Sequence, residues 1–119
     1  MYAHGALAQR YMETGKDAKA MKHIDRVLAQ DSERPLFQGL KGHALSRLGN
    51  PDGAMKCFER SLGQSKGVGP ARWKAEALAR AHRDDEAIAA LEDVTVTWPE
   101  DLQAQQMLVK LLEKRQTRR

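Results

Sequence analysis

The sequence has few of the residues from which disulfide-rich, metal-binding or membrane-spanning proteins are built. Cys57 is the single cysteine, so neither an intrachain disulfide nor a cysteine metal cluster can form. The four histidines show no ligand spacing, and we expect no metal or other cofactor. No run of about 18 apolar residues is present, and the N-terminus lacks an apolar signal-peptide core. These absences favour a cytoplasmic protein, unless the chain is a fragment that has lost a targeting segment.

Aromatic residues are also scarce, at 5% of the chain, whereas Ala, Leu, Lys, Arg, Glu and Gln are plentiful. Straight side chains lose little rotamer freedom on a helix and Ala loses none, so this composition favours helices. With 119 residues, 41% apolar and 30% charged, the chain has the size and polarity of one soluble globular domain.

The net charge of +4 is concentrated at one end of the chain. The segment 110–119 holds five basic residues against Glu113 alone, and residues 1–109 hold 15 basic and 15 acidic groups. The body of the domain is therefore neutral, and the excess of basic residues lies at the C-terminal end. A neutral body argues against nucleic acid as the partner.

The sequence repeats itself. Shifted by 34 residues, the first and second segments agree at eight positions, including Gly5 with Gly39 and Gly15 with Gly49. A third copy follows at a spacing of 33, where Ala20, Ala54 and Ala87 align. Fixed periods of this length are typical of helical solenoids.

Each copy predicts two amphipathic helices joined by a tight turn. The first helices are expected at about 2–14, 35–48 and 70–81, and the second at about 17–30, 51–63 and 84–97. A seventh helix is expected at about 102–115. Gly15 and Gly49 follow helix ends, where a left-handed conformation suits Gly. His82 replaces Gly in the third copy, which predicts a strained or differently shaped turn, and the glycine-rich segment 63–70 predicts a looser joint.

The pattern of small and bulky positions resembles the tetratricopeptide repeat family over nearly the whole chain. Small residues stand at 8, 20, 42, 54, 75 and 87, where helix axes approach closely, and bulky residues flank them. The resemblance implies an all-α fold: a right-handed α-α superhelix of three helical hairpins. We expect a single domain over 1–119, with repeats at about 1–34, 35–67 and 68–101, a capping helix at about 102–115 and a basic tail at 116–119.

The resemblance also implies a function, which is to bind a peptide or helix of another protein in a concave groove lined by the first helices. The positions that correspond to the family's groove are Tyr2, Gly5, Gln9, Met12, Glu13, Leu36, Gly39, His43, Ser46, Arg47, Arg72, Glu76, Ala79, Arg80, Gln106 and Lys110. Gly5 and Gln9 stand where the family's chaperone-tail readers place Lys and Asn, so we expect no such clamp.

Two hypotheses about the groove follow. Gly5 and Gly39, with Tyr2, Met12 and Leu36 nearby, predict a shallow apolar pocket for a large side chain of the partner. Four cations predict that the other half of the groove is basic and receives acidic residues: Arg47, Arg72, Arg80 and Lys110. Together they describe a partner segment with an apolar anchor and acidic residues beyond it.

The sequence raises three other interpretations. Helix 102–115 or helix 2–14 could dock on a second copy and drive homo-oligomer assembly, with Leu108, Leu111 and Leu112 as the expected contacts. RNA binding by a related helical repeat requires long arrays and a basic groove, which this chain lacks. Catalysis is disfavoured because no phosphate loop or paired catalytic residues are recognisable, and Cys57 and Trp73 are expected to be structural.

Overall fold

The computed structural model describes residues 2–31 and 34–117, with side chains from residue 7 onward in the first helix. Within these residues the chain forms seven α-helices and no strand. Their bounds are α1 Tyr2–Glu13, α2 Asp17–Gln30, α3 Pro35–Arg47, α4 Pro51–Gln64, α5 Val68–Arg80, α6 Asp84–Thr97 and α7 Leu102–Thr117. The predicted all-α fold is confirmed, and the predicted helices agree with the observed ones to within about two residues.

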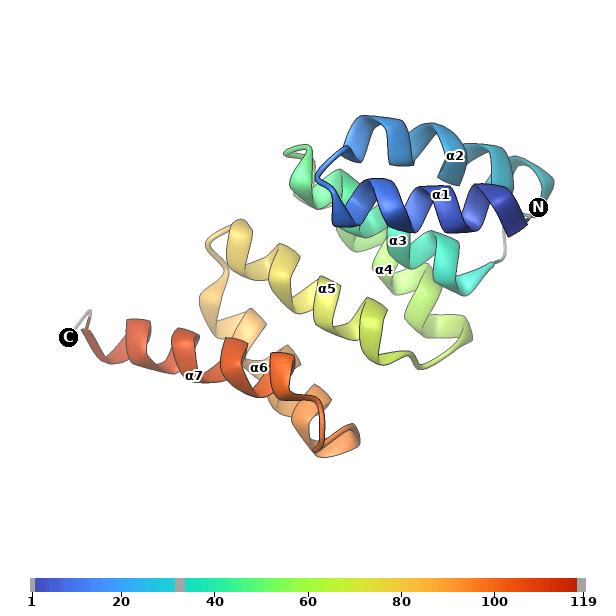
Figure 1. The fold of residues 1–119 in the computed structure, drawn as a ribbon. Coiled ribbons are helices and arrows are strands. Elements are labelled where there is room, and N and C mark those ends of the chain that lie inside the picture. Colours follow the sequence, from blue (N-terminus) through green and yellow to red (C-terminus); the bar gives the residue numbers. More distant parts are fainter. Residues whose placement is uncertain (1, 32–33, 118–119) are drawn as a thin grey trace.

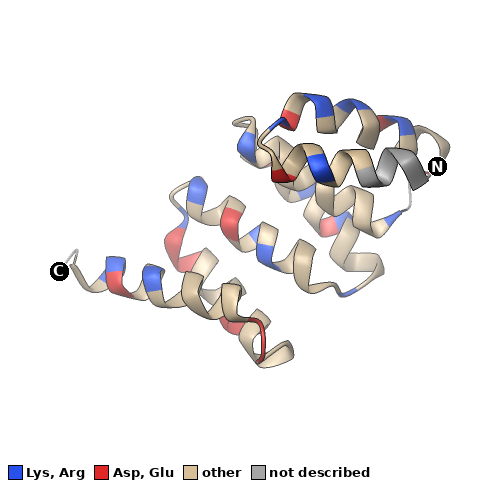
Figure 2. Cartoon of the chain, viewed as in Figure 1, with Lys and Arg blue, Asp and Glu red and all other residues tan. Residues whose placement is uncertain are grey.

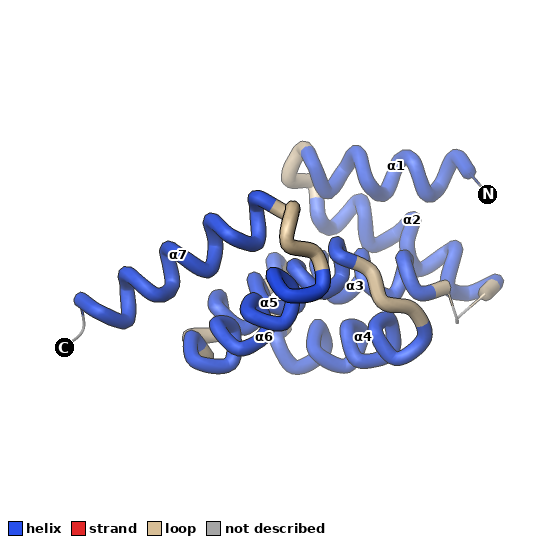
Figure 3. The backbone as a smooth tube through the Cα atoms, turned by 90° about the horizontal axis from the view of Figure 1, so that it is seen from below, coloured by secondary structure: helices blue, strands red, loops and turns tan. Residues whose placement is uncertain are grey.

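The helices form three antiparallel hairpins that stack along one direction, followed by α7 (Figure 1). Hairpin 1 is α1 and α2, hairpin 2 is α3 and α4, and hairpin 3 is α5 and α6. The stack is elongated, with extents of 48 × 26 × 23 Å. Short loops join the helices throughout (Figure 3). None of the helices in the described ranges is long and apolar enough to cross a bilayer.

The turn inside each hairpin is closed by two backbone hydrogen bonds at equivalent positions. Their N–H donors are residues 15 and 16 in the first turn, 49 and 50 in the second, and 82 and 83 in the third. In the first two turns the left-handed residue is Gly15, at φ 79°, or Gly49, at φ 91°. His82 takes the same place in the third turn at φ 61°, and its turn keeps both hydrogen bonds. Of the two predicted alternatives, a strained turn or a differently shaped one, the structure shows the first. The shape is kept, and the strain arises because a side chain with a Cβ occupies a conformation that Gly adopts freely.

The second helices begin where local chemistry supports a helix start. At α4, the Asn50 side chain accepts a hydrogen bond from the Gly53 backbone N–H at 3.0 Å, and Pro51 occupies the first helical position. At α6, three acidic residues occupy the first turn, where the helix dipole favours negative charge.

Small residues let neighbouring helices approach closely. Ala20, Ala54 and Ala87 are completely buried, as the repeat pattern predicts, and so are Ala8 and Ala75. Phe58 fills the space beside them within hairpin 2 and is also completely buried. The stacking of hairpins through their small residues is confirmed.

The joint between hairpins 2 and 3 is shorter than the glycine-rich segment 63–70 predicts. Helix α4 continues to Gln64 and α5 begins at Val68, which leaves residues 65–67 between them. Pro70 is buried and packs against α3. The start of α5 is thereby anchored, and the predicted loose joint shrinks to three residues.

Candidate partner-binding groove

The first helices of the three hairpins enclose a hollow of about 390 Å³. Its lining comes from α1, α3 and α5: Gln9, Met12, Glu13, Leu40, His43, Arg47 and Trp73. Five of these residues are among the positions that the family resemblance implies. Leu40 and Trp73 were not among them. The hollow therefore lies where the groove was expected, but its floor differs.

Trp73 is the aromatic side chain of this floor. Its ring stacks on His43 with centroids 5.0 Å apart and planes 9° apart. It also packs against a core cluster formed by α1, α2 and α3 and another formed by α4 and α5, and is only partly buried. Trp73 was expected to be structural; it packs at the junction between hairpins and also presents part of its surface to the hollow. The repeat gave little warning, because the equivalent position in hairpin 2 is the aliphatic Leu40.

His43 is a neutral side chain at pH 7. Burial is the largest influence and lowers its pKa below the ordinary value of 6.5. Arg47 and Arg80 lower the pKa further, and the carboxylates of Glu76 and Asp17 raise it. The hollow thus has a polar but uncharged ring in its wall.

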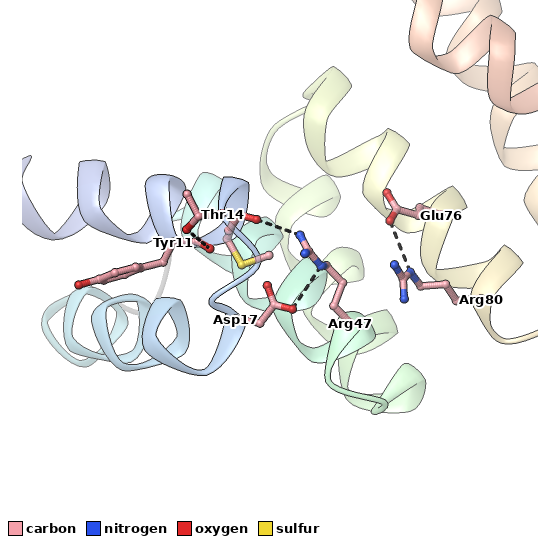
Figure 4. Close-up of polar contacts among 7 residues, drawn as sticks. Tyr11, Thr14, Asp17, Arg47, Glu76 and Arg80 are labelled. Carbon is pink, nitrogen blue, oxygen red and sulfur yellow. Dashed lines mark hydrogen bonds and ion pairs between the residues drawn. The ribbon is translucent and has the colours of Figure 1, made fainter.

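Arg47 is held inside the protein. Its Nε lies 3.2 Å from the Asp17 carboxylate, and its Nη1 donates a hydrogen bond to the Met12 backbone carbonyl at 3.0 Å (Figure 4). The Arg47 and Asp17 side chains are 26% and 12% exposed. Arg47 therefore ties α3 to the turn of hairpin 1, and its charge is largely compensated.

Arg72 is also held, at the far end of the stack. Its Nη1 lies 2.6 Å from Oδ2 of Asp101, and both side chains are mostly buried. The other oxygen of Asp101 accepts hydrogen bonds from the backbone N–H groups of Gln103 and Ala104 at the start of α7. Arg72 thus fixes the residue that caps α7 and does not line the hollow.

The prediction of a continuous basic half of the groove is wrong as stated. Two of its four cations are committed to internal carboxylates, and Lys110 lies on α7 in a separate hollow with Gln106 and Glu113. Acidic and basic residues are interspersed along the helices (Figure 2). Arg80 is the remaining member, and it pairs with Glu76 on its own helix at 3.4 Å.

The predicted apolar pocket beside Gly39 is also wrong. Gly39 is buried, and a Cβ at this position would lie 2.8 Å from Cγ of Pro70, so the start of α5 occupies the space. Met12 is 5% exposed, whereas Leu36 is 45% exposed and lies outside the hollow. Tyr2 and Gly5 lie in the first part of α1, where the structure describes the backbone alone.

The residues expected to mediate self-association are partly buried within the protein. Leu108 and Leu111 pack against the core of hairpin 3, and Leu108, Leu111 and Leu112 each keep part of their surface exposed. The large apolar side chains that α7 exposes most are Leu102 and Val109.

Other candidate chemistry is weak. Cys57 is half-buried, and burial raises the pKa of its thiol above 9.0, which favours the inert protonated form. Among the residues that the structure describes, no three His, Cys, Asp or Glu side chains gather as a metal site would require.

Comparison with known proteins agrees with this architecture. The tetratricopeptide repeat family model matches residues 37–66, which lie in hairpin 2. The first repeat domain of Spaghetti (RPAP3), solved with the HSP90 peptide SRMEEVD, superposes with a TM-score of 0.82 at 17% identity, over 95% of this chain and 93% of that one. The first domain of human RPAP3 gives 0.83 at 17% identity, over 94% and 89%.

The second domain of human RPAP3, solved with the HSP70 peptide SGPTIEEVD, gives a TM-score of 0.77 at 18% identity, over 91% of each chain. At the level of sequence, no characterised protein matches closely enough to count as a relative. The class is nevertheless defined: the chain is an all-α helical-repeat protein. Residues 37–66 match the model of the tetratricopeptide repeat, and the chain as a whole has the fold of the tetratricopeptide-repeat domains in the matching structures.

Proposed function

We propose that the chain is a non-catalytic protein-interaction module that binds a peptide or helix of a partner protein across α1, α3 and α5. The hollow of about 390 Å³ is the observation that carries this proposal. It gathers side chains from three helices that belong to three different hairpins. Such a surface suits an extended chain crossing several helices.

The floor of the hollow supports a partner with an apolar contact. The exposed part of Trp73 supplies the apolar surface, since Leu40 and Met12 are themselves only 2% and 5% exposed, and Gln9 and Glu13 supply polar groups at the edge. Trp is a residue type that recognition surfaces use often, because it offers a large rigid area. Domains of the same fold hold peptides in the Spaghetti and human RPAP3 structures.

The partner is expected to differ from the chaperone tails of those structures. Gln9 stands where the clamp of chaperone-tail readers has Asn, and Gly5 stands where it has Lys. With no Lys at this position, a terminal carboxylate loses one charge-assisted contact. Cys57 is the single cysteine and cannot form an intrachain disulfide, which is compatible with a reducing compartment, and on this support we propose a cytoplasmic location.

Selection of linear peptides from a random displayed library tests the proposal. Wild-type protein should enrich a family of related peptides, and Gln9→Arg should weaken their binding because it places a long charged side chain in the hollow. Gln30→Arg is the matched control, since Gln30 is exposed on α2 away from the hollow. The proposal fails if wild-type protein enriches no related peptides, or if Gln9→Arg binds them as tightly as Gln30→Arg does.

A further inference from the structure

A recurring ion pair joins successive units of the stack. In the first case Asp17, at the start of α2, pairs with Arg47 near the end of α3 at 3.2 Å. In the other, Asp84, at the start of α6, pairs with Lys114 near the end of α7 at 3.0 Å. The two aspartates stand 67 residues apart, and so do the two cations, which corresponds to two repeats. Each aspartate side chain is 12% exposed.

At the junction between hairpins 2 and 3, the cation of this repeating ion pair is present but the aspartate is not. One repeat after Asp17 the residue is Pro51, which has no carboxylate, while one repeat after Arg47 the residue is Arg80. Arg80 therefore has no carboxylate in hairpin 2 to which it could bind as Arg47 binds Asp17. Among the described residues, it is the one cation of this set without a partner in the neighbouring hairpin.

The contact that Arg80 does make leaves most of its donors available. Its Nε lies 3.4 Å from Oε1 of Glu76, and the two side chains are 51% and 36% exposed. Nη1 and Nη2 have no partner within the described part of the chain. Exposed pairs four residues apart on a helix contribute about 0.3–0.5 kcal/mol, so this pair restrains the guanidinium only weakly.

Arg80 does not line the hollow, but it lies beside two residues that do, His43 and Arg47. Figure 4 shows its side chain extending from α5 toward the side where Arg47 lies, with Glu76 beside it. Its charge is close enough to His43, in the wall of the hollow, to lower the pKa of that histidine. A guanidinium with both Nη groups free presents parallel N–H donors that match the two oxygens of a carboxylate.

We propose that Arg80 determines specificity by receiving an Asp or Glu side chain of the peptide bound in the hollow. This inference rests on the proposed function and names its partner chemistry. Arg47 and Arg72 do not serve this role, because internal carboxylates hold them. One acidic residue at a fixed position, rather than a run of acidic residues, is therefore the expected feature of the ligand.

The test uses the peptides that wild-type protein enriches from the random library, with dissociation constants measured by fluorescence anisotropy. The peptides should share Asp or Glu at one position, and its replacement by Ala should weaken binding about 10-fold or more, the usual effect of losing a charge-assisted contact. Arg80→Gln should weaken binding of the acidic peptide by the same factor, and it should hardly change binding of the Ala-substituted peptide. Arg60→Gln, an exposed arginine on α4, is the matched control and should change neither.

A second set of variants acts through Arg80 without removing it. Pro51→Asp restores the aspartate of the repeating ion pair and should hold Arg80 inside the protein, so the affinity for the acidic peptide should fall. Pro51→Ala is its control and should leave that affinity unchanged. Glu76→Gln removes the carboxylate that competes for Arg80 and should raise the affinity for the acidic peptide. Circular dichroism verifies that each variant is folded.

Two negative results are distinguishable. Enriched peptides without a shared acidic residue, or equal binding by Arg80→Gln and wild type, overturn the role of Arg80 and leave the peptide-binding function standing. Failure of wild-type protein to enrich any related peptides overturns both.

Discussion

Gly42→Ala offers a sharp test of how closely α3 and α4 approach. Within most helix interiors this substitution stabilises a protein by about 1 kcal/mol, because Ala has the higher helix propensity. Gly42 lies within α3 and is buried. Here we expect the opposite result, a loss of stability.

The magnitude follows from what the new methyl group would meet. A Cβ on residue 42 would lie 2.9 Å from Cε1 of Phe58 and 3.0 Å from the backbone oxygen of Ala54. Ordinary contacts between such atoms are about 3.5–4.0 Å. Phe58 and Ala54 are both completely buried, and one of the two atoms belongs to the backbone, so neither can move aside cheaply. Overpacking costs about 1–3 kcal/mol, and two such contacts place this site toward the upper end. After the gain in propensity, a net loss of about 1–2 kcal/mol remains.

Urea unfolding, followed by far-UV circular dichroism, measures the effect. Gly63→Ala is the matched control, because Gly63 is an exposed residue of α4 and a Cβ there meets nothing within 4 Å. The control should gain about 0.5–1 kcal/mol. The two substitutions should thus move the unfolding midpoint in opposite directions. If Gly42→Ala is as stable as wild type or more so, the hairpin is not packed as tightly as described.

Three further outcomes are expected. His82→Gly should stabilise the protein by about 1 kcal/mol in the same unfolding assay, because Gly adopts the left-handed conformation of this turn without strain; a loss would show that His82 makes a stabilising contact. A double-mutant cycle with Arg72→Met and Asp101→Asn should give a coupling free energy of about 1–2 kcal/mol, since the pair is mostly buried; additive single effects would refute the role of Arg72 in fixing α7. Because burial lowers the pKa of His43, the unfolded chain takes up a proton there at higher pH than the folded protein does, so stability should fall as the pH drops through 6.5 and level off below the lowered pKa. His43→Gln should remove that part of the fall in urea titrations over this pH range, and an unchanged pH profile would contradict the lowered pKa.

The helices were predictable because their signals are local. Periodic apolar residues, Gly15 and Gly49 after helix ends, and the Asn50–Pro51 start each act within one or two turns of the chain. The repeat then placed the small residues between helices. The boundaries differ most at the end of α7 and at the start of α5, where the helical state of the residues depends on packing of Pro70 against α3.

The chemistry of the groove was less predictable because contacts between hairpins decide it. Family positions identified much of the hollow's lining, including His43 and Arg47, but could not show which cations had internal partners. The pairing of Arg47 with Asp17 spans 30 residues, and that of Arg72 with Asp101 spans 29. A signal was present in the first case, since the acid and the cation both recur two repeats later at Asp84 and Lys114. No sequence signal indicated that Pro70 would fill the space over Gly39.

Helix α3 is in close contact with α4 and α5, which limits how it can move when a ligand binds. Pro70 of α5 packs against it at Gly39, and the ring of Phe58 packs against it at Gly42. The Ser61 hydroxyl of α4 donates a hydrogen bond to the Pro35 carbonyl at 2.7 Å. A helix so confined cannot roll or slide to suit an incoming chain. The curvature of the recognition surface is accordingly set before any encounter, and free and bound forms should superpose closely along α3, α4 and the start of α5.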